Sequence, residues 1–136
     1  MKLLIKPVTI NGVVIPKYWI DAEGNIWSSK NNKMSKLKPV VSGKSPYPSV
    51  GLYNNSKIKR IAVHRLVCEA YHKFPVPAGV SKTEWAQTPD SVKKLMSTLY
   101  QVNHIDHDHL NFHPSNLEWV TAQENQQKYQ KHAKTK

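Results

Sequence analysis

Three kinds of residue are scarce in this chain, and each scarcity excludes a class of protein. Cys68 is the only cysteine among 136 residues, which rules out an intramolecular disulfide and a zinc site built from several thiolates. Arg60 and Arg65 are the only arginines, so the guanidinium forks that read guanine are few. No apolar run approaches transmembrane length, and the N-terminal MKLLIKP lacks the features of a signal peptide. We therefore expect an intracellular protein without a membrane partner.

Acidic residues are also scarce. Nine Asp and Glu stand against 20 Lys and Arg, which gives a formal net charge of +11 and a pI near 9.8. Such a charge favours a polyanionic partner, most commonly nucleic acid, although a merely soluble basic protein is the simpler alternative. Nearly all of the positive charge is lysine, a point charge suited to phosphate contacts. We expect backbone-dominated DNA binding with modest base readout.

Short strands are predicted in the first half of the chain. Asn11-Gly12 is a hairpin signal between two apolar runs, and a second strand–turn–strand pattern centres on Glu23-Gly24. Residues 29–39 form a polar, lysine-rich segment. The alternation of apolar residues predicts strands over 47–53 and 57–62, joined by a turn at 54–56.

Two helices are predicted after these strands. Residues 63–72 have helical spacing, and a proline-rich stretch over 74–80 follows. Thr88 is predicted to be the N-cap of a second helix that begins at Pro89 and runs to about Leu99. This second helix would bury Val92, Leu95, Met96 and Leu99. The basic tail KYQKHAKTK would fray or lie along DNA.

The most informative stretch is Val102–Gln126, VNHIDHDHLNFHPSNLEWVTAQENQ. It sets His104, Asn116 and Asn125 at intervals of 12 and 9 residues. The pattern predicts a strand over 101–105, a loop, and a return strand over 117–120. Thr121 and Glu124 then fit a capping box that opens a helix. Together these elements make a ββα unit.

Metal-dependent cleavage of a phosphodiester needs a base, a hard Lewis acid and a group that orients the base. His104 can be the base, because an imidazole titrates near working pH. Asn103 and Asn125 can offer amide oxygens to a Mg²⁺-type ion. Asn116 can hydrogen-bond across the loop and hold His104. The simpler alternatives are a structural histidine, an Asx turn at Asn116 and an ordinary exposed helix residue at Asn125.

Other histidines and Arg65 have less specific signals. His107, His109 and His113 resemble a metal cluster at first sight, but their loop position favours solvated side chains. His64 and Arg65 are expected to tie their helix to the ββα unit, with phosphate contact as the alternative.

The Val102–Gln126 stretch resembles the HNH nuclease family, specifically its phage and intron homing-endonuclease branch. There the motif has the form V-(D/N)-H-I-D … N-L-x-W-V-T … E-N. The upstream VHRLVCEAYH and YWIDAEGNIWSSKNNKMSKLKP are similar to a segment and a small DNA-binding module of that branch. The resemblance covers roughly residues 17–73 and 101–126.

The resemblance implies Asn103 and Asn125 as metal ligands, His104 as general base and Asn116 as its orienting partner. It also implies hydrolysis of DNA phosphodiesters to 5′-phosphate and 3′-hydroxyl ends. One divalent ion would be needed, Mg²⁺ first and Mn²⁺ or another as alternatives, with no small-molecule cofactor. If the protein is encoded by a phage, it would work in the cytoplasm of a bacterial host. A non-catalytic DNA-binding protein on an eroded HNH scaffold and a nuclease assisting phage DNA packaging remain as alternatives.

The expected fold is α+β, with an N-terminal antiparallel β module followed by an HNH ββα-metal nuclease core. The β module would span residues 1–60 and bind DNA; the nuclease domain would span 61–136, with a helical insertion near 82–100. Double-stranded DNA is the expected partner. A hairpin over 47–60 is the favoured element for the major groove. The predicted phosphate contacts are Lys30, Lys33, Lys36, Lys57, Lys59 and Arg60, unless these cations only solubilise exposed sheet faces.

Overall fold

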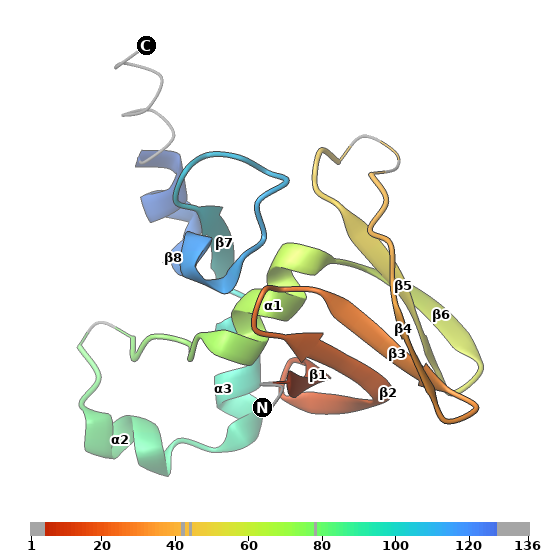
Figure 1. The fold of residues 1–136 in the computed structure, drawn as a ribbon. Helices are drawn as coiled ribbons and strands as arrows, with labels where there is room; N and C mark the ends of the chain where they lie inside the picture. The colour runs from red at the N-terminus through yellow and green to blue at the C-terminus, as the bar shows by residue number, and fades with distance from the viewer. Residues whose placement is uncertain (1–4, 42, 44, 78, 128–136) are drawn as a thin grey trace.

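A computed structural model describes residues 5–41, 43, 45–77 and 79–127, arranged as Figure 1 shows. The basic tail lies outside the described residues. The strands are β1 (Ile5–Ile10), β2 (Val13–Asp21), β3 (Ile26–Lys30), β4 (Lys33–Lys36), β5 (Ser49–Asn54), β6 (Lys57–Ala62), β7 (Tyr100–His104) and β8 (Leu117–Thr121). The helices are α1 (Val63–Tyr71), α2 (Lys82–Gln87), α3 (Asp90–Ser97) and the short 3-10 turn η1 (Pro114–Asn116), and residues 122–127 are also helical. The predicted α+β class is confirmed.

The N-terminal sheet has the order β1-β2-β3-β4, and its strand pairs are antiparallel. The predicted turn between β1 and β2 is confirmed, with Asn11 and Gly12 both at positive φ. Strand β4 differs from the prediction, which makes 29–39 only a polar segment. Asn31 and Asn32 adopt positive φ and turn the chain back on β3. All four residues of β4 are exposed, so no apolar alternation marks the strand.

Strands β5 and β6 form a separate two-stranded ribbon, as predicted, with register Gly51↔Arg60 at its middle. The backbone N–H of Tyr53 donates to the Tyr18 hydroxyl at 2.9 Å and so joins the ribbon to the N-terminal sheet. Strand β6 ends at Ala62 and α1 begins at Val63, so no loop residue separates ribbon and helix.

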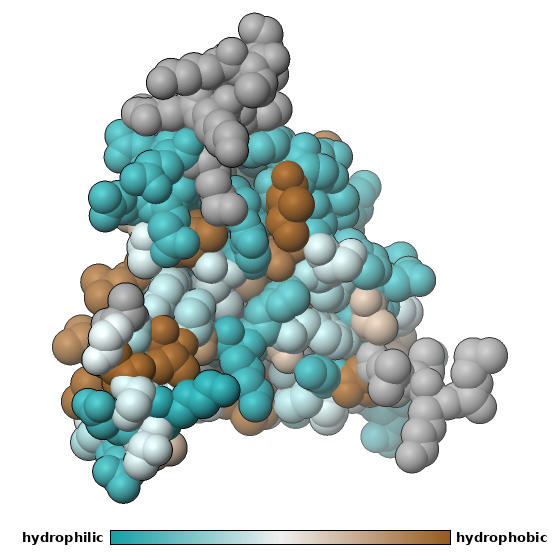
Figure 2. Space-filling view, turned by 90° about the vertical axis from the view of Figure 1, so that its left-hand side faces the viewer, coloured by the Kyte–Doolittle hydropathy of each residue, from teal (hydrophilic) through white to brown (hydrophobic). Residues whose placement is uncertain are grey.

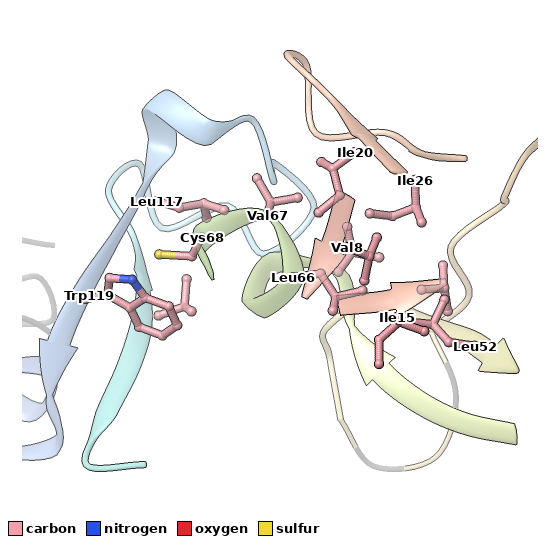
Figure 3. Packing of buried hydrophobic residues seen from close by; sticks show 13 residues of the cluster. Val8, Ile15, Ile20, Ile26, Leu52, Leu66, Val67, Cys68, Leu117 and Trp119 are labelled. Atoms are coloured by element: carbon pink, nitrogen blue, oxygen red, sulfur yellow. The ribbon is translucent and has the colours of Figure 1, made fainter. Parts of the chain in front are cut away.

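Helix α1 lies at the centre of the core. Leu66, Val67 and Cys68 are fully buried on it, and Figure 3 shows them between two groups of apolar side chains. On one side are residues of the N-terminal sheet and the ribbon; on the other are Leu117 and Trp119 of β8. Cys68 is therefore a core residue, as its sequence context predicted, and burial raises the pKa of its thiol to about 12.

The region before β7 differs from the prediction. Thr88 is not an N-cap: it ends α2, where its hydroxyl donates to the Glu84 carbonyl at 2.8 Å, and Pro89 stands at the N-cap of α3. Helix α2 itself has no counterpart in the prediction. The expected burial of α3 is also wrong, since Val92, Leu95 and Leu99 are 41%, 70% and 63% exposed. In Figure 2, which faces this side of the molecule, apolar groups lie exposed in the lower half below a largely hydrophilic upper half. No helix of the described ranges is long and apolar enough to cross a membrane.

The ββα unit forms as predicted. Strands β7 and β8 pair antiparallel with Asn103 opposite Glu118 and His104 opposite Leu117. The capping box is present: the Glu124 N–H donates to the Thr121 hydroxyl at 3.2 Å, and the Thr121 N–H donates back to the Glu124 carboxylate at 3.3 Å. The helix after β8 therefore starts at a defined residue and sets the position of Asn125.

The turn between β2 and β3 packs against the loop of the ββα unit. The Asp21 carboxylate accepts hydrogen bonds from the backbone of Glu23 and Asn25 and from the Trp27 indole, which fixes the turn. Gly24 within it has a φ of +89°, and a Cβ there would lie 2.5 Å from the Phe112 backbone oxygen. Glycine is therefore required here by both backbone conformation and close approach.

This contact predicts unequal costs for two alanine substitutions. Gly12 has a similar φ of +82°, but a Cβ at that position would have no atom within 4 Å. Gly12→Ala should therefore lower the free energy of unfolding only by the strain term of about 1–2 kcal/mol. Gly24→Ala adds overpacking and should cost about 2–5 kcal/mol. Urea denaturation of the two variants measures both values. Equal losses would show that the Phe112 contact is not a constraint.

Candidate active site

The predicted base, His104, is the last residue of β7 and only 4% exposed. Its register opposite Leu117 holds the backbone in the sheet, and its ring borders a cleft of about 300 Å³. The cleft is lined by Tyr47, Gln101, Val102, Asn103, His104, His107, His109, Ala122, Asn125 and Gln126. Asn103, His104 and Asn125, which sequence spacing singled out, therefore meet in one place.

The two cleft asparagines are held through their amide nitrogens. Asn103 Nδ2 donates to Glu118 Oε1 at 2.8 Å, and Asn125 Nδ2 donates to Gln101 Oε1 at 3.0 Å. Since each NH₂ group is engaged by a neighbour, each Oδ1 is left as the acceptor that a cation could use. Two amide oxygens are hard ligands of the kind that Mg²⁺ and similar ions accept.

Asn116 holds the loop between β7 and β8. Its Oδ1 accepts from the Asp106 N–H at 3.0 Å, while its Nδ2 donates to the Asp106 carboxylate and to the Asn111 carbonyl, both at 2.9 Å. Its carbonyl accepts from the Ile105 N–H at 2.8 Å. The side chain thus reaches the residues after His104 and bonds to them rather than to the imidazole. An orienting role for Asn116 stays a prediction, to be exerted through the loop backbone.

Aromatic rings surround the His104 imidazole. Tyr47 stacks on it with ring centres 5.5 Å apart and an interplanar angle of 12°. His64 meets it edge-on at 5.0 Å, and His109 does so at 5.8 Å. Tyr47 also contacts the rings of His64 at 4.5 Å and His109 at 4.8 Å. These neighbours come from segments far apart in the sequence.

Burial lowers the pKa of His104 below its ordinary value, and the nearby His109 lowers it further, against the opposing effect of Asp106 and Asp108. The ring is therefore neutral at neutral pH and able to accept a proton. The Asp106 carboxyl has a lowered pKa, chiefly through its hydrogen bond from Asn111, and its bonds organise the loop. Glu118, opposite Asn103, places a carboxylate directly behind one amide of the cleft.

Arg65 and His64 separate in function although they are neighbours. Arg65 Nη1 donates to the Tyr100 carbonyl at 3.3 Å and its guanidinium lies 5.1 Å from the Trp119 ring centre, so it ties α1 to the ββα unit as expected. His64 instead turns its ring toward His104. Of the loop histidines, His107 and His109 border the cleft, whereas His113 bonds to Ser115.

The predicted phosphate contacts lie away from the cleft. Lys30, Lys33, Lys36, Lys57, Lys59 and Arg60 are all exposed, on β3, β4 and β6. Arg60 reaches across the ribbon, where its guanidinium donates to the Ser49 carbonyl and hydroxyl, both at 3.2 Å.

Sequence reasoning missed Tyr47, Gln101 and Glu118 as parts of the cleft and its surroundings. Glu118 could have been found from the predicted strands, because an antiparallel pairing that puts His104 opposite Leu117 also puts Asn103 opposite Glu118. Tyr47 gave no such signal, since no local pattern connects it with a residue 57 positions later.

A small antiparallel strand pair, a capped helix and an imidazole flanked by two amides define the ββα type of nuclease site. The profile of the HNH endonuclease family matches residues 62–127. The chain belongs to this family of DNA-cleaving hydrolases, whose nucleases typically use a divalent metal ion, and the predicted resemblance is confirmed.

Two curated relatives are each 30% identical to this chain. One is an uncharacterized HNH endonuclease, L245, of Acanthamoeba polyphaga mimivirus, matched over 79% of this chain and 26% of the relative. The other is the H-N-H endonuclease F-TflII of Escherichia phage T5, matched over 80% of this chain and 45% of the relative. The chain thus spans less than half the length of either.

A solved structure described as DNA binding and cleavage by the HNH homing endonuclease I-HmuI has a similar fold. The TM-score is 0.65 at 24% identity, over 98% of this chain and 60% of the other. The likeness covers the N-terminal sheet as well as the ββα unit.

The packing of His64 predicts a pH dependence of stability. Burial, followed by the nearby His104, lowers the pKa of His64 from 6.5 to about 4 in the folded protein. The unfolded chain therefore binds this proton more readily. The stability contributed by the neutral ring is complete above pH 6.5 and is lost as the pH falls toward 4.

Between these limits the wild type should lose up to about 1.4 kcal/mol of unfolding free energy per pH unit relative to His64→Asn. Urea denaturation of both proteins from pH 7.5 to 4 measures the difference. Parallel curves throughout would contradict the burial of a neutral His64.

Proposed function

We propose that this protein is a metal-dependent DNA endonuclease of the homing type, which hydrolyses phosphodiester bonds to leave 5′-phosphate and 3′-hydroxyl ends. The observation that carries the proposal is the meeting of His104 with Asn103 and Asn125 in one cleft at the end of β7. The names of the T5 relative and of the I-HmuI structure support the homing type and the DNA substrate.

In this proposal His104 is the general base. It removes a proton from a water molecule as the water oxygen attacks phosphorus, and the bond from phosphorus to the 3′ oxygen breaks. The Nε2 atom of His104 is buried and, within the described part of the chain, has no hydrogen-bond partner. Nδ1 is therefore the nitrogen that takes the proton from water, since it can serve without displacement of Tyr47 or His64. Asn116 supports the base by holding the loop that follows it.

The cleft suits one divalent ion, with Mg²⁺ first and Mn²⁺ or another as alternatives. Oδ1 of Asn103 and Oδ1 of Asn125 would hold it, because their amide nitrogens are already engaged. When bound, the ion supplies Lewis-acid stabilisation of charge on the leaving and nonbridging oxygens. Both ligands are uncharged, so weak affinity is expected. Glu118 behind Asn103 offsets this in part by adding a negative charge nearby.

The DNA duplex is proposed to lie along the N-terminal sheet and the β5–β6 ribbon, where the six exposed cations contact phosphates. A groove of about 760 Å³ separates the sheet and the ribbon and adds Lys17 beside Lys30. The ribbon is the element proposed for the major groove, which admits a two-stranded ribbon. Phosphate contacts of this kind set position without reading sequence.

The first test of the catalytic proposal is His104→Ala in a plasmid cleavage assay with Mg²⁺, Mn²⁺ or EDTA. The variant should lose on the order of 10²–10⁴ in cleavage rate, because a general base is missing, while DNA affinity stays near wild type. His113→Ala is the matched control, since this histidine bonds Ser115 outside the cleft. EDTA should abolish cleavage by the wild type.

Substantial Mg²⁺-dependent cleavage by His104→Ala would remove the base assignment. If the wild type binds DNA and does not cut it with any of the ions, the second candidate gains: a non-catalytic DNA-binding protein. The wholly uncharged pair of proposed ligands is the observation that keeps this alternative in view.

The second test replaces Lys57, Lys59 and Arg60 of β6 together by Gln. If each contacts a phosphate, the slope of log K against log salt should flatten by about three units, at about 0.9 per contact. Affinity should fall alike for all DNA sequences, and cleavage per bound complex should survive. Lys82, Lys93 and Lys94, on α2 and α3, changed together to Gln form the control of equal charge. The same salt slope in both triple variants would show that the ribbon does not hold the duplex.

A further inference from the structure

Two imidazole nitrogens next to each other have no hydrogen-bond partner. His64 Nδ1 and His104 Nε2 are both buried and unpaired among the residues that the structure describes. Their rings are edge-on, with centres 5.0 Å apart and an interplanar angle of 71°. A buried polar atom left without a partner is destabilising, so two such atoms in adjacent rings call for a common explanation.

The two rings are enclosed and their backbones are fixed. Tyr47 covers both, flat against His104 and edge-on to His64. His64 is the second residue of α1, whose first N–H, from Val63, donates to the Pro48 carbonyl at 2.9 Å. Since Leu66 and Val67 anchor the same helix in the core, the His64 backbone holds a constant position relative to β7.

We propose that His64 is the positioning residue of the catalytic base, with His64 Nδ1 accepting a hydrogen bond from the Nε2–H of His104. A bond of about 3 Å between nitrogens, together with the radius of each ring, puts two imidazole centres about 5 Å apart, which is the spacing present here. The χ2 torsion of histidine is broad, so rotation of the rings forms the bond without a shift of the backbone.

The direction of the bond follows from the chemistry of His104. With its proton on Nε2, the imidazole keeps an unprotonated Nδ1 for the water molecule; the reverse donor would place the proton on Nδ1 and block the base. After His104 takes the second proton, its cationic ring donates to a neutral acceptor, and such charge-assisted bonds are the stronger ones. Burial keeps His64 neutral and thus fit to accept. The inference rests on the proposed role of His104 as base.

Two variants separate the hydrogen bond from the packing. His64→Asn keeps an acceptor oxygen near the place of Nδ1, whereas His64→Phe keeps a ring and removes the acceptor. Single-turnover cleavage of plasmid at saturating protein and Mg²⁺ should fall roughly 10- to 100-fold for His64→Phe and only a few-fold for His64→Asn. DNA affinity and melting temperature, measured alongside, should stay near wild type. His113→Phe, outside the cleft, is the control and should keep the wild-type rate.

The tautomer of His104 gives a readout that does not depend on cleavage. Long-range ¹⁵N–¹H NMR of the metal-free protein should show the Nε2–H form for His104 in the wild type and in His64→Asn. It should show a mixture of forms in His64→Phe.

A wild-type His104 protonated on Nδ1 would overturn the proposal, as would a wild-type cleavage rate for a folded His64→Phe. A loss confined to DNA affinity would make His64 a phosphate contact instead. If His64→Phe does not fold, His64→Asn and the wild-type tautomer still decide the question. Failure of the proposed function would appear separately, as cleavage by His104→Ala.

Discussion

The burial of α1 between the N-terminal sheet and the ββα unit is the constraint on which the cleft depends. One face of this helix meets β1 and the other meets β7 and β8, so the two halves of the chain share one apolar core. Three fully buried residues, Leu66, Val67 and Cys68, hold the helix in place. Its first turn then brings His64 against His104, while Arg65 bonds the backbone of β7. A change in the depth or rotation of α1 would move both contacts together.

Features that depend on neighbours in the sequence could be predicted, and those that depend on distant packing could not. The Asn11-Gly12 turn and the Thr121–Glu124 capping box follow from local backbone chemistry, and both are present. Strand β4 escaped because its side chains are all exposed and show no apolar alternation. Helix α3 has the spacing of a buried helix, yet no described element covers Leu95 and Leu99, so periodicity alone overestimated the core.

The candidate site divides in the same way. Asn103, His104 and Asn125 share one short ββα unit, so their spacing sufficed to place them together. Asn116 lies in the loop as expected, but its partners are Asp106 and Asn111, which spacing cannot reveal. Tyr47 and His64 reach His104 only because the ribbon and α1 pack beside β7, and that arrangement is a property of the whole fold. The division of the chain into modules at residues 60 and 61 stays a prediction.

The junction between β6 and α1 has a mechanical consequence. Ribbon and helix are continuous at Ala62 and Val63, and His64 follows one residue later. A turn of flexible residues would let the ribbon swing independently, whereas this join makes the ribbon a lever rigidly attached to the neighbour of the catalytic ring. If the ribbon seats in a groove of the duplex, the number of base pairs between grip and cut is set by covalent geometry. The protein would then measure distance along DNA as a ruler does, even without reading many bases.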